Sequence, residues 1–256
     1  MFITDTHTHL YLEEFDEDRK EMIERALDND VKCLLLPNID SSSINGMMQL
    51  CKQFPSNCFP MMGLHPTSVK ENYQEELDLV EDWIKKEKFY AIGEIGIDLY
   101  WDKTFQQEQE IAFVYQIELA IKHQFPIVIH MRDSFDEVYT VVKNYASPEL
   151  KGVFHCFTGT LEQAQKIIDL NFKLGIGGVV TFKNSGLDKV VEKIDMKHLL
   201  LETDSPFLTP VPHRGKRNET AYVRFVAEKI ASIKNIPLEQ VAEITTSNAN
   251  QLFKFM

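Results

Sequence analysis

Histidine and carboxylate side chains recur where the short apolar runs of this sequence end. His7 and His9, separated by one residue, follow the first run, and Glu202 and Asp204 follow the last. Further side chains of these types follow four intermediate runs, at His65, Glu94, His130 and His155. Imidazole nitrogens and carboxylate oxygens are ligands for Zn²⁺, Mn²⁺ and similar divalent ions. If the fold brings them together, these residue types predict metal-assisted hydrolysis.

The local spacing indicates which of these side chains share a face. Side chains alternate in direction along a strand, so His7 and His9 are expected on the same side. Asp5 joins them if the strand stays regular, and the same rule aligns Glu202 with Asp204. The set is large enough for two ions that share a carboxylate, and Glu94, which has glycines on both sides, is the expected bridge.

The elements that must position these residues are strands separated by amphipathic stretches. Eight β-branched or apolar runs predict strands, at residues 2–7, 31–37, 58–64, 90–95, 126–130, 152–157, 172–177 and 199–203. Helical apolar stripes lie between them, for example at Leu77, Val80 and Ile84. We therefore expect an α/β fold, a single (β/α)8 TIM barrel over residues 1–256 with an extra C-terminal helix at 237–253. In such a barrel the carboxyl ends of all strands meet on one face, so the candidate ligands would converge there.

Composition narrows the class of protein. The chain has 256 residues, 44% of them hydrophobic, and a formal net charge of −12, so it can build a large core but repels phosphate backbones and anionic membranes. It has no apolar run of the roughly 20 residues that a membrane span needs, and its first residues lack a basic, then apolar, leader pattern. We expect a cytoplasmic protein with no membrane or protein partner. The four cysteines have no paired spacing and are expected to be reduced and buried, at positions 33, 51, 58 and 156.

Seven segments, taken together, resemble the signature of a known family. They are Asp5–Leu10, Gly63–Pro66, Gly93–Asp98, Ile129–Asp133, His155–Gly159, Glu202–Pro206 and Arg214–Asn218. In order and spacing they are similar to the TatD family of metal-dependent deoxyribonucleases, within the amidohydrolase-like metallohydrolases. Two departures from the usual family pattern, Met131 and Thr220, lie outside the metal ligands that the family uses.

The resemblance implies two divalent ions per chain, with Mg²⁺, Mn²⁺ and Zn²⁺ all open. One site would use His7, His9, Glu94 and Asp204, and the other would use Glu94, His130 and His155. It also implies a 3′→5′ exonuclease or endonuclease that acts on DNA, with some activity on RNA.

A mechanism can be assigned to three carboxylates. Glu94 would bridge the ions, and Asp204 would orient a metal-bridging hydroxide and accept its proton. Glu202, which is expected on the same face, could position Asp204 without itself binding an ion. The alternative for Glu202 is a structural carboxylate paired with a buried Arg or Lys.

Substrate contacts are expected around the mouth of the barrel. His65 and Arg132 would donate hydrogen bonds to a phosphate oxygen, or only make hydrogen bonds at the rim. Arg214 and Lys216 belong to the densest basic stretch, which follows the last strand, where barrels often bind phosphate. Their alternative is a solvated loop. Two aromatic side chains could stack on an unpaired base, or cap the mouth instead, namely Tyr100 and Trp101.

These inferences favour a metal-dependent phosphodiesterase that removes nucleotides from the 3′ end of single-stranded DNA or RNA. The same site could instead hydrolyse small amides, lactones or phosphate esters, since an activated water attacks carbon or phosphorus alike. A barrel that only binds a metal or a partner remains a third hypothesis. The acidic surface favours the engagement of a strand end over the wrapping of a duplex.

Overall fold

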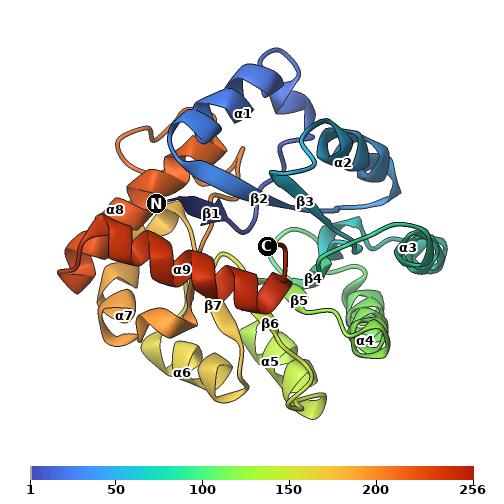
Figure 1. The fold of residues 1–256 in the computed structure, drawn as a ribbon. Coiled ribbons are helices and arrows are strands. Elements are labelled where there is room, and N and C mark those ends of the chain that lie inside the picture. Colours follow the sequence, from blue (N-terminus) through green and yellow to red (C-terminus); the bar gives the residue numbers. More distant parts are fainter. Residues whose placement is uncertain (1) are drawn as a thin grey trace.

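The computed structural model describes residues 2–256, in which strands and helices alternate around a central barrel (Figure 1). The eight strands of this range are β1 Ile3–Asp5, β2 Val31–Pro37, β3 Cys58–Met61, β4 Ile92–Asp98, β5 Ile127–Arg132, β6 Gly152–Phe154, β7 Lys173–Ile176 and β8 Leu199–Leu201. Every pair of neighbouring strands is parallel. The predicted (β/α)8 barrel is therefore confirmed.

The strands pair in two runs, β1 to β3 and β4 to β8. Single bridges join the runs at both junctions, between Met62 and Ile92 and between Thr8 and Ser205. At the second junction the Asp204 N–H also donates to the His7 carbonyl, at 2.9 Å. The residues just after β1 and β8 are thus hydrogen-bonded to one another.

Helices cover the outside of the barrel. They are α1 Arg19–Asp28, α2 Ser41–Gln53, α3 Tyr73–Lys86, α4 Gln106–His123, α5 Phe135–Asn144, α6 Leu161–Asp169, α7 Leu187–Lys193, α8 Val223–Lys234 and α9 Leu238–Phe253. Short 3₁₀ turns lie at η1 Glu13–Phe15, η2 Pro66–Ser68, η3 Gly178–Thr181, η4 Met196–His198 and η5 Thr220–Tyr222. Local sequence explains several of the boundaries. At α6, for example, Thr160 and Gln163 form a reciprocal capping box. Among residues 2–256, no helix has the length and apolar character of a membrane span.

The predicted extra helix is α9, which crosses the amino-terminal end of the barrel (Figure 1). Inward side chains such as Leu35, Val128 and Leu200 form a small inner core with Phe253 and Phe255 at the end of α9. A larger core lies between the strands and the surrounding helices. With α9 across it, one end of the barrel is closed, and the opposite end is left for the site.

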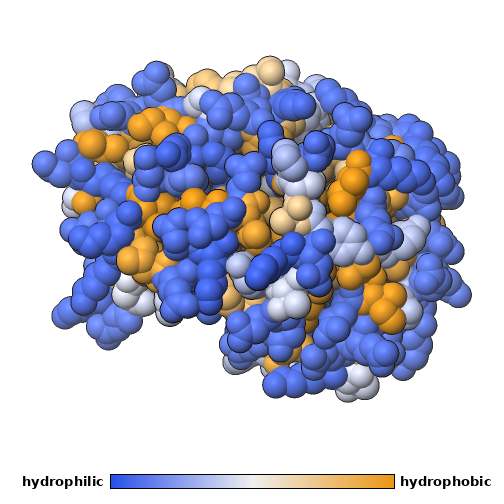
Figure 2. All heavy atoms as spheres, turned by 90° about the horizontal axis from the view of Figure 1, so that it is seen from below, coloured by the Kyte–Doolittle hydropathy of each residue, from blue (hydrophilic) through white to orange (hydrophobic). Residues whose placement is uncertain are grey.

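On the face in Figure 2 the surface is mainly hydrophilic, with scattered hydrophobic patches.

Several sequence predictions about strand ends are wrong in detail. The predicted runs 2–7, 58–64 and 199–203 extend beyond β1, β3 and β8, which end at Asp5, Met61 and Leu201. Glu94 and His130 lie inside β4 and β5, because these two strands continue to pair as far as Asp98 and Arg132. β6 ends at Phe154, so Cys156 lies in the loop that follows, with a φ of 48°. Cys156 is also only half-buried and lines the cavity described below, whereas the other three cysteines are buried; all four are free thiols.

Candidate metal centre

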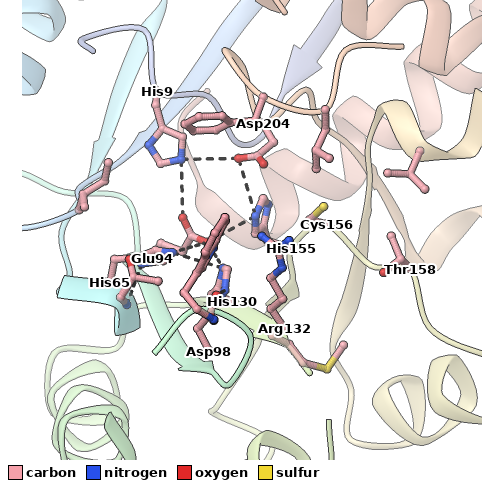
Figure 3. Close-up of a pocket in the computed structure, with 17 residues that line it drawn as sticks. His9, His65, Glu94, Asp98, His130, Arg132, His155, Cys156, Thr158 and Asp204 are labelled. Atoms are coloured by element: carbon pink, nitrogen blue, oxygen red, sulfur yellow. Dashed lines mark hydrogen bonds and ion pairs between the residues drawn. The ribbon is translucent and has the colours of Figure 1, made fainter. Parts of the chain in front are cut away.

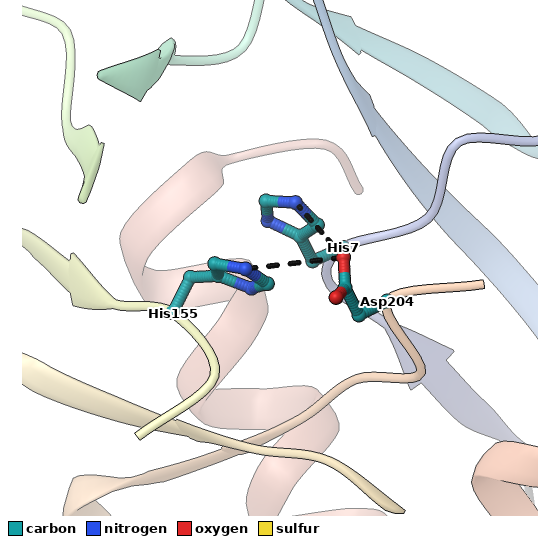
Figure 4. Close-up of side chains that lie close together, drawn as sticks. All are labelled: His7, His155 and Asp204. Carbon is teal, nitrogen blue, oxygen red and sulfur yellow. Dashed lines mark ion pairs between the residues drawn. The ribbon is translucent and has the colours of Figure 1, made fainter. Parts of the chain in front are cut away.

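Six predicted ligands meet at the carboxyl end of the barrel. His7 and His9 follow β1, Glu94 and His130 belong to β4 and β5, and His155 and Asp204 follow β6 and β8. Figure 3 shows His9, Glu94, His155 and Asp204 directed toward a common centre. Figure 4 shows the imidazoles of His7 and His155, which stack with their centroids 3.5 Å apart, both facing one oxygen of the Asp204 carboxylate. Parallel strands of a barrel explain this convergence of residues that are distant in the sequence.

Four of these side chains form a first cluster. His7 Nε2 lies 3.2 Å from His9 Nε2, 3.0 Å from Glu94 Oε2 and 3.8 Å from Asp204 Oδ1. His9 Nε2 lies 3.6 Å from the same two carboxylate oxygens. Four ligands about 2.1 Å from a tetrahedral ion are separated from one another by about 3.4 Å. The donor atoms and their separations therefore fit a divalent ion.

A second cluster surrounds the other oxygen of Glu94. His130 Nδ1 lies 2.8 Å from Glu94 Oε1, and His155 Nε2 lies 3.4 Å from the same oxygen. Each carboxylate oxygen of Glu94 thus faces a different group of imidazoles. Burial opposes the ionisation of Glu94, but the neighbouring rings of His7, His65 and His155 outweigh it and hold the pKa of the carboxyl well below its usual range. Glu94 is therefore an anion that lies between two groups of candidate ligands.

Asp98 orients His130 from behind. Its Oδ2 lies 2.8 Å from His130 Nε2, so the other ring nitrogen, Nδ1, is the one directed at Glu94. The second carboxylate oxygen of Asp98 accepts hydrogen bonds from the backbone N–H groups of Tyr100 and Trp101. Sequence reasoning assigned no role to Asp98. Its position four residues after Glu94 on one strand was the available signal, since even spacing places both side chains on one face.

Glu202 has the corresponding place behind His155. Its Oε1 lies 3.1 Å from His155 Nδ1 and accepts a hydrogen bond from the Cys156 N–H. Burial disfavours the imidazolium of His155, but Glu202 and Glu94 outweigh it and raise the pKa of His155 to about 10. No Lys or Arg of residues 2–256 forms an ion pair with Glu202. The Glu202 carboxylate therefore contacts the imidazole of a candidate ligand. Within residues 2–256 it does not form the structural ion pair with Lys or Arg that was the alternative.

Asp5 does not join the cluster, contrary to expectation. Its carboxylate accepts hydrogen bonds from the Thr203 N–H and hydroxyl and from the Thr220 hydroxyl. Complete burial raises the pKa of Asp5 to about 7, against the opposing effect of these hydrogen bonds. β1 ends at Asp5, so the alternation assumed for residues 5–9 breaks there. Asp5 ties β1 to the segments after β8.

His65 reaches the second cluster with a fixed orientation. Its Nδ1 accepts a hydrogen bond from the Thr67 N–H at 3.1 Å, and its Nε2 lies 3.5 Å from Glu94 Oε1. In a neutral ring whose Nδ1 is an acceptor, Nε2 carries the hydrogen. His65 is therefore built to donate a hydrogen bond into the site.

Arg132 and two aromatic residues form one rim of the site. The centre of the Arg132 guanidinium lies 3.8 Å from the Tyr100 ring centroid and 5.1 Å from that of Trp101. The two rings are 52% and 67% exposed. A cavity of about 550 Å³ is lined by Arg132, Trp101 and His65 together with five of the candidate ligands. Tyr100 lies behind Arg132 and is not part of the cavity wall.

The basic stretch after β8 lies farther out. Arg214 stacks on Phe182, with the guanidinium 3.8 Å from the ring centroid, and Lys216 is exposed. Neither residue lines the cavity. Arg217 instead pairs with Asp18 just before α1, at 2.7 Å. The structure therefore brings His65, Arg132 and Trp101 to the cavity, but not Arg214 or Lys216.

Comparisons with known proteins identify the family of this chain. The family model described as TatD related DNase matches residues 4–254. The chain is 41% identical to the metal-dependent hydrolase YabD of Bacillus subtilis, over 98% of both chains. It is 34% identical to the metal-dependent hydrolase YcfH of Escherichia coli, over 99% of this chain and 96% of that one.

Solved structures show the same fold. The crystal structure of YjjV, a TatD homologue from Escherichia coli, superposes with a TM-score of 0.90 at 26% identity, over 98% of both chains. The lactonase Lmo2620 of Listeria monocytogenes shares the fold alone, with a TM-score of 0.71 at 12% identity, over 100% of this chain and 95% of that one. The family match and the identities decide the assignment: this chain belongs to the TatD family of metal-dependent hydrolases.

Proposed function

We propose that this protein hydrolyses phosphodiester bonds, as a two-metal 3′→5′ exonuclease on single-stranded DNA or RNA. The observation that carries the proposal is the position of Glu94, whose two carboxylate oxygens each face a separate group of imidazoles. The donor atoms that lie close together form the groups His7–His9–Glu94, His7–His155–Asp204 and His65–Glu94–His130. From these contacts we infer one ion at His7, His9, Glu94 and Asp204 and a second at Glu94, His130 and His155. The nitrogen-rich donor set favours Zn²⁺ by affinity, whereas Mg²⁺ and Mn²⁺ are favoured by availability.

Two ions held by these residues would lower the pKa of a water molecule and stabilise the charge that grows on the phosphate oxygens. Asp204 would take the proton of that water. Its side chain keeps 15% exposure toward the cavity, and the imidazoles of His9, His155 and His7 outweigh burial to hold its pKa below the usual value. In the reaction the water oxygen bonds to phosphorus and the ester P–O bond breaks. The leaving oxygen takes up a proton from solvent.

Two hydrogen-bond donors would hold the substrate phosphate. The Nε2–H of His65 lies beside Glu94. The Arg132 guanidinium stacks on Tyr100 and forms no ion pair with a carboxylate of residues 2–256. Of the aromatic pair, Trp101 would stack on an unpaired base, with Tyr100 behind Arg132. Arg214 and Lys216 lie outside the cavity and would contact the more distant phosphates of a strand.

A chelation experiment tests the proposal. A 5′-labelled single-stranded oligonucleotide is incubated with protein treated with EDTA, then with Mg²⁺, Mn²⁺ or Zn²⁺ added back. We expect loss of cleavage with EDTA, recovery on add-back and a ladder that shortens from the 3′ end. Glu94→Gln should abolish cleavage, and the exposed Glu75→Gln on α3 is the matched control.

Lactone, amide and phosphate monoester substrates are assayed beside the oligonucleotide. Hydrolysis of one of those without cleavage of any phosphodiester would replace the proposal with the small-molecule hydrolase. Cleavage that resists EDTA would refute the role of the ions.

A further inference from the structure

The wall of the cavity opposite Arg132 is apolar and has no role in the mechanism above. Phe207 and Leu208, in the loop after β8, are 48% and 36% exposed. Together with Val179 of η3 they line the same cavity as the metal ligands. Strands β8 and β1 lie across the barrel from β4 and β5, so this wall faces the Trp101 rim (Figure 1). Exposed apolar side chains that gather at a functional cavity indicate a binding surface.

Phe207 lies directly beside a candidate metal ligand. Its ring centroid is 6.3 Å from that of His9, and the two ring planes are inclined by 63°. A group stacked on the exposed face of Phe207 would therefore be adjacent to a phosphate held at the metal centre. The opposite rim supplies the positive charge, through Arg132 and His65.

The backbone holds this apolar wall in place. The Phe207 N–H donates to the Asp204 carbonyl at 2.8 Å, and the Phe207 carbonyl accepts from the side chain of Asn218 at 2.6 Å. Asn218 is fully buried and also donates to the Thr203 carbonyl. Leu208 has a φ of 54°, a left-handed conformation that is unfavourable for a leucine. The loop is thus fixed in a conformation that exposes two apolar side chains beside the reacting position.

We propose that Phe207, Leu208 and Val179 form a binding surface for the nucleobase next to the scissile phosphate. The inference rests on the proposed phosphodiesterase function and explains how the site would select a substrate that carries a base. A nucleobase is flat and aromatic, and stacking on an aromatic side chain is tolerant of base identity. The enzyme then distinguishes a nucleotide from a simple phosphodiester by this wall, while the phosphate is held by the opposite rim.

A pair of chromogenic esters with the same leaving group tests the surface. Thymidine 5′-(4-nitrophenyl phosphate) carries a base, and methyl 4-nitrophenyl phosphate carries none. We expect Phe207→Ala to lower kcat/KM for the thymidine ester by about tenfold or more, and for the methyl ester by less than about twofold. Phe207→Tyr, which keeps a ring, should restore the preference. Leu79→Ala, at a similarly exposed apolar residue on α3, is the matched control.

Binding measured without turnover separates this inference from the proposed function. Thymidine monophosphate and inorganic phosphate are titrated by calorimetry into the metal-loaded wild type and Phe207→Ala. If Phe207→Ala binds the nucleotide more weakly but binds phosphate equally well, the result supports the base-binding surface. This holds even if neither ester is hydrolysed, because lack of hydrolysis would count only against the proposed phosphodiesterase function. Equal losses for both esters and both ligands, or no loss for any, would overturn the base-binding role of Phe207.

Discussion

His130 differs from the other histidines of the cluster in the ring nitrogen that it turns toward Glu94. His7, His9 and His155 present Nε2, whereas His130 presents Nδ1 because Asp98 contacts its Nε2. The sequence predicted all four histidines as ligands but could not predict this choice. Which nitrogen a histidine presents depends on its outer hydrogen-bond partner, and that partner is set by tertiary structure.

Asp98→Asn should weaken metal binding without removing a ligand. The substitution keeps the shape of the side chain but removes the negative charge that holds the His130 ring. Loss of such an outer partner typically lowers metal affinity by about 10- to 100-fold. Competition with a chromophoric chelator measures the change, and Asp82→Asn on the exposed face of α3 is the control. Unchanged affinity in Asp98→Asn would contradict the positioning role.

Metal binding at His155 should release a proton at neutral pH. In the metal-free protein Glu202 and Glu94 raise its pKa from the ordinary 6.5 to about 10, and a ligand imidazole must lose that proton. Apparent metal affinity should therefore rise from pH 7 toward pH 10. The same proton stabilises the metal-free fold below pH 6.5, and this contribution disappears as the pH rises toward 10. Calorimetry in two buffers of different ionisation enthalpy counts the protons, and a count of zero would contradict the assignment.

At the level of elements, the sequence predicted the strands well and their ends less well. All eight apolar runs contain the observed strands or most of them, because burial on both faces makes a parallel strand apolar throughout. The sequence did not predict the last residues of β4 and β5, because the strands continue to pair through the polar residues Asp98 and Arg132. Pairing between two strands is a tertiary property that apolar runs do not report.

Gly175 in β7 makes room for Glu202. A Cβ atom at this position would lie 2.2 Å from Glu202 Oε2. Gly175→Ala should therefore displace Glu202, loosen His155 and weaken metal binding by about tenfold or more. Gly46→Ala within α2, where the nearest atom would be 3.8 Å away, should instead be neutral or stabilise the fold by up to about 1 kcal/mol. Metal titration and denaturant unfolding of both variants check the contrast.

At the level of the whole molecule, the sequence gives the net charge but does not show which charged side chains pair. The basic stretch after β8 is expected to contact phosphate, yet its Arg217 pairs with Asp18, which is 199 positions away. Arg214 lies on Phe182 instead. Sequence supplies the number of charges, whereas their partners depend on which surfaces the barrel brings together. The net charge of −12 therefore includes Glu94, Glu202 and Asp204, which lie at the candidate metal centre.

Divalent ions should raise the melting temperature of the whole chain. A ligand that binds only the folded state at about 1,000 times its Kd stabilises it by about 4 kcal/mol. For a chain of this size that is roughly 8–16 °C. Thermal unfolding with EDTA and with excess Zn²⁺ or Mn²⁺ measures the shift, and Glu94→Gln, which lacks the shared ligand, should show little of it. An equal shift in Glu94→Gln would place the stabilising ions elsewhere.

The hydrogen bonds that join the ends of β1 and β8 also affect how the protein is made. His7 and His9 are synthesised about 200 residues before Asp204 and the Thr203 and Thr220 partners of Asp5. A nascent chain that ends before β8 therefore has an open barrel and an incomplete ligand set. The protein can acquire a complete candidate metal centre only after β8 and the segment that follows it have been synthesised.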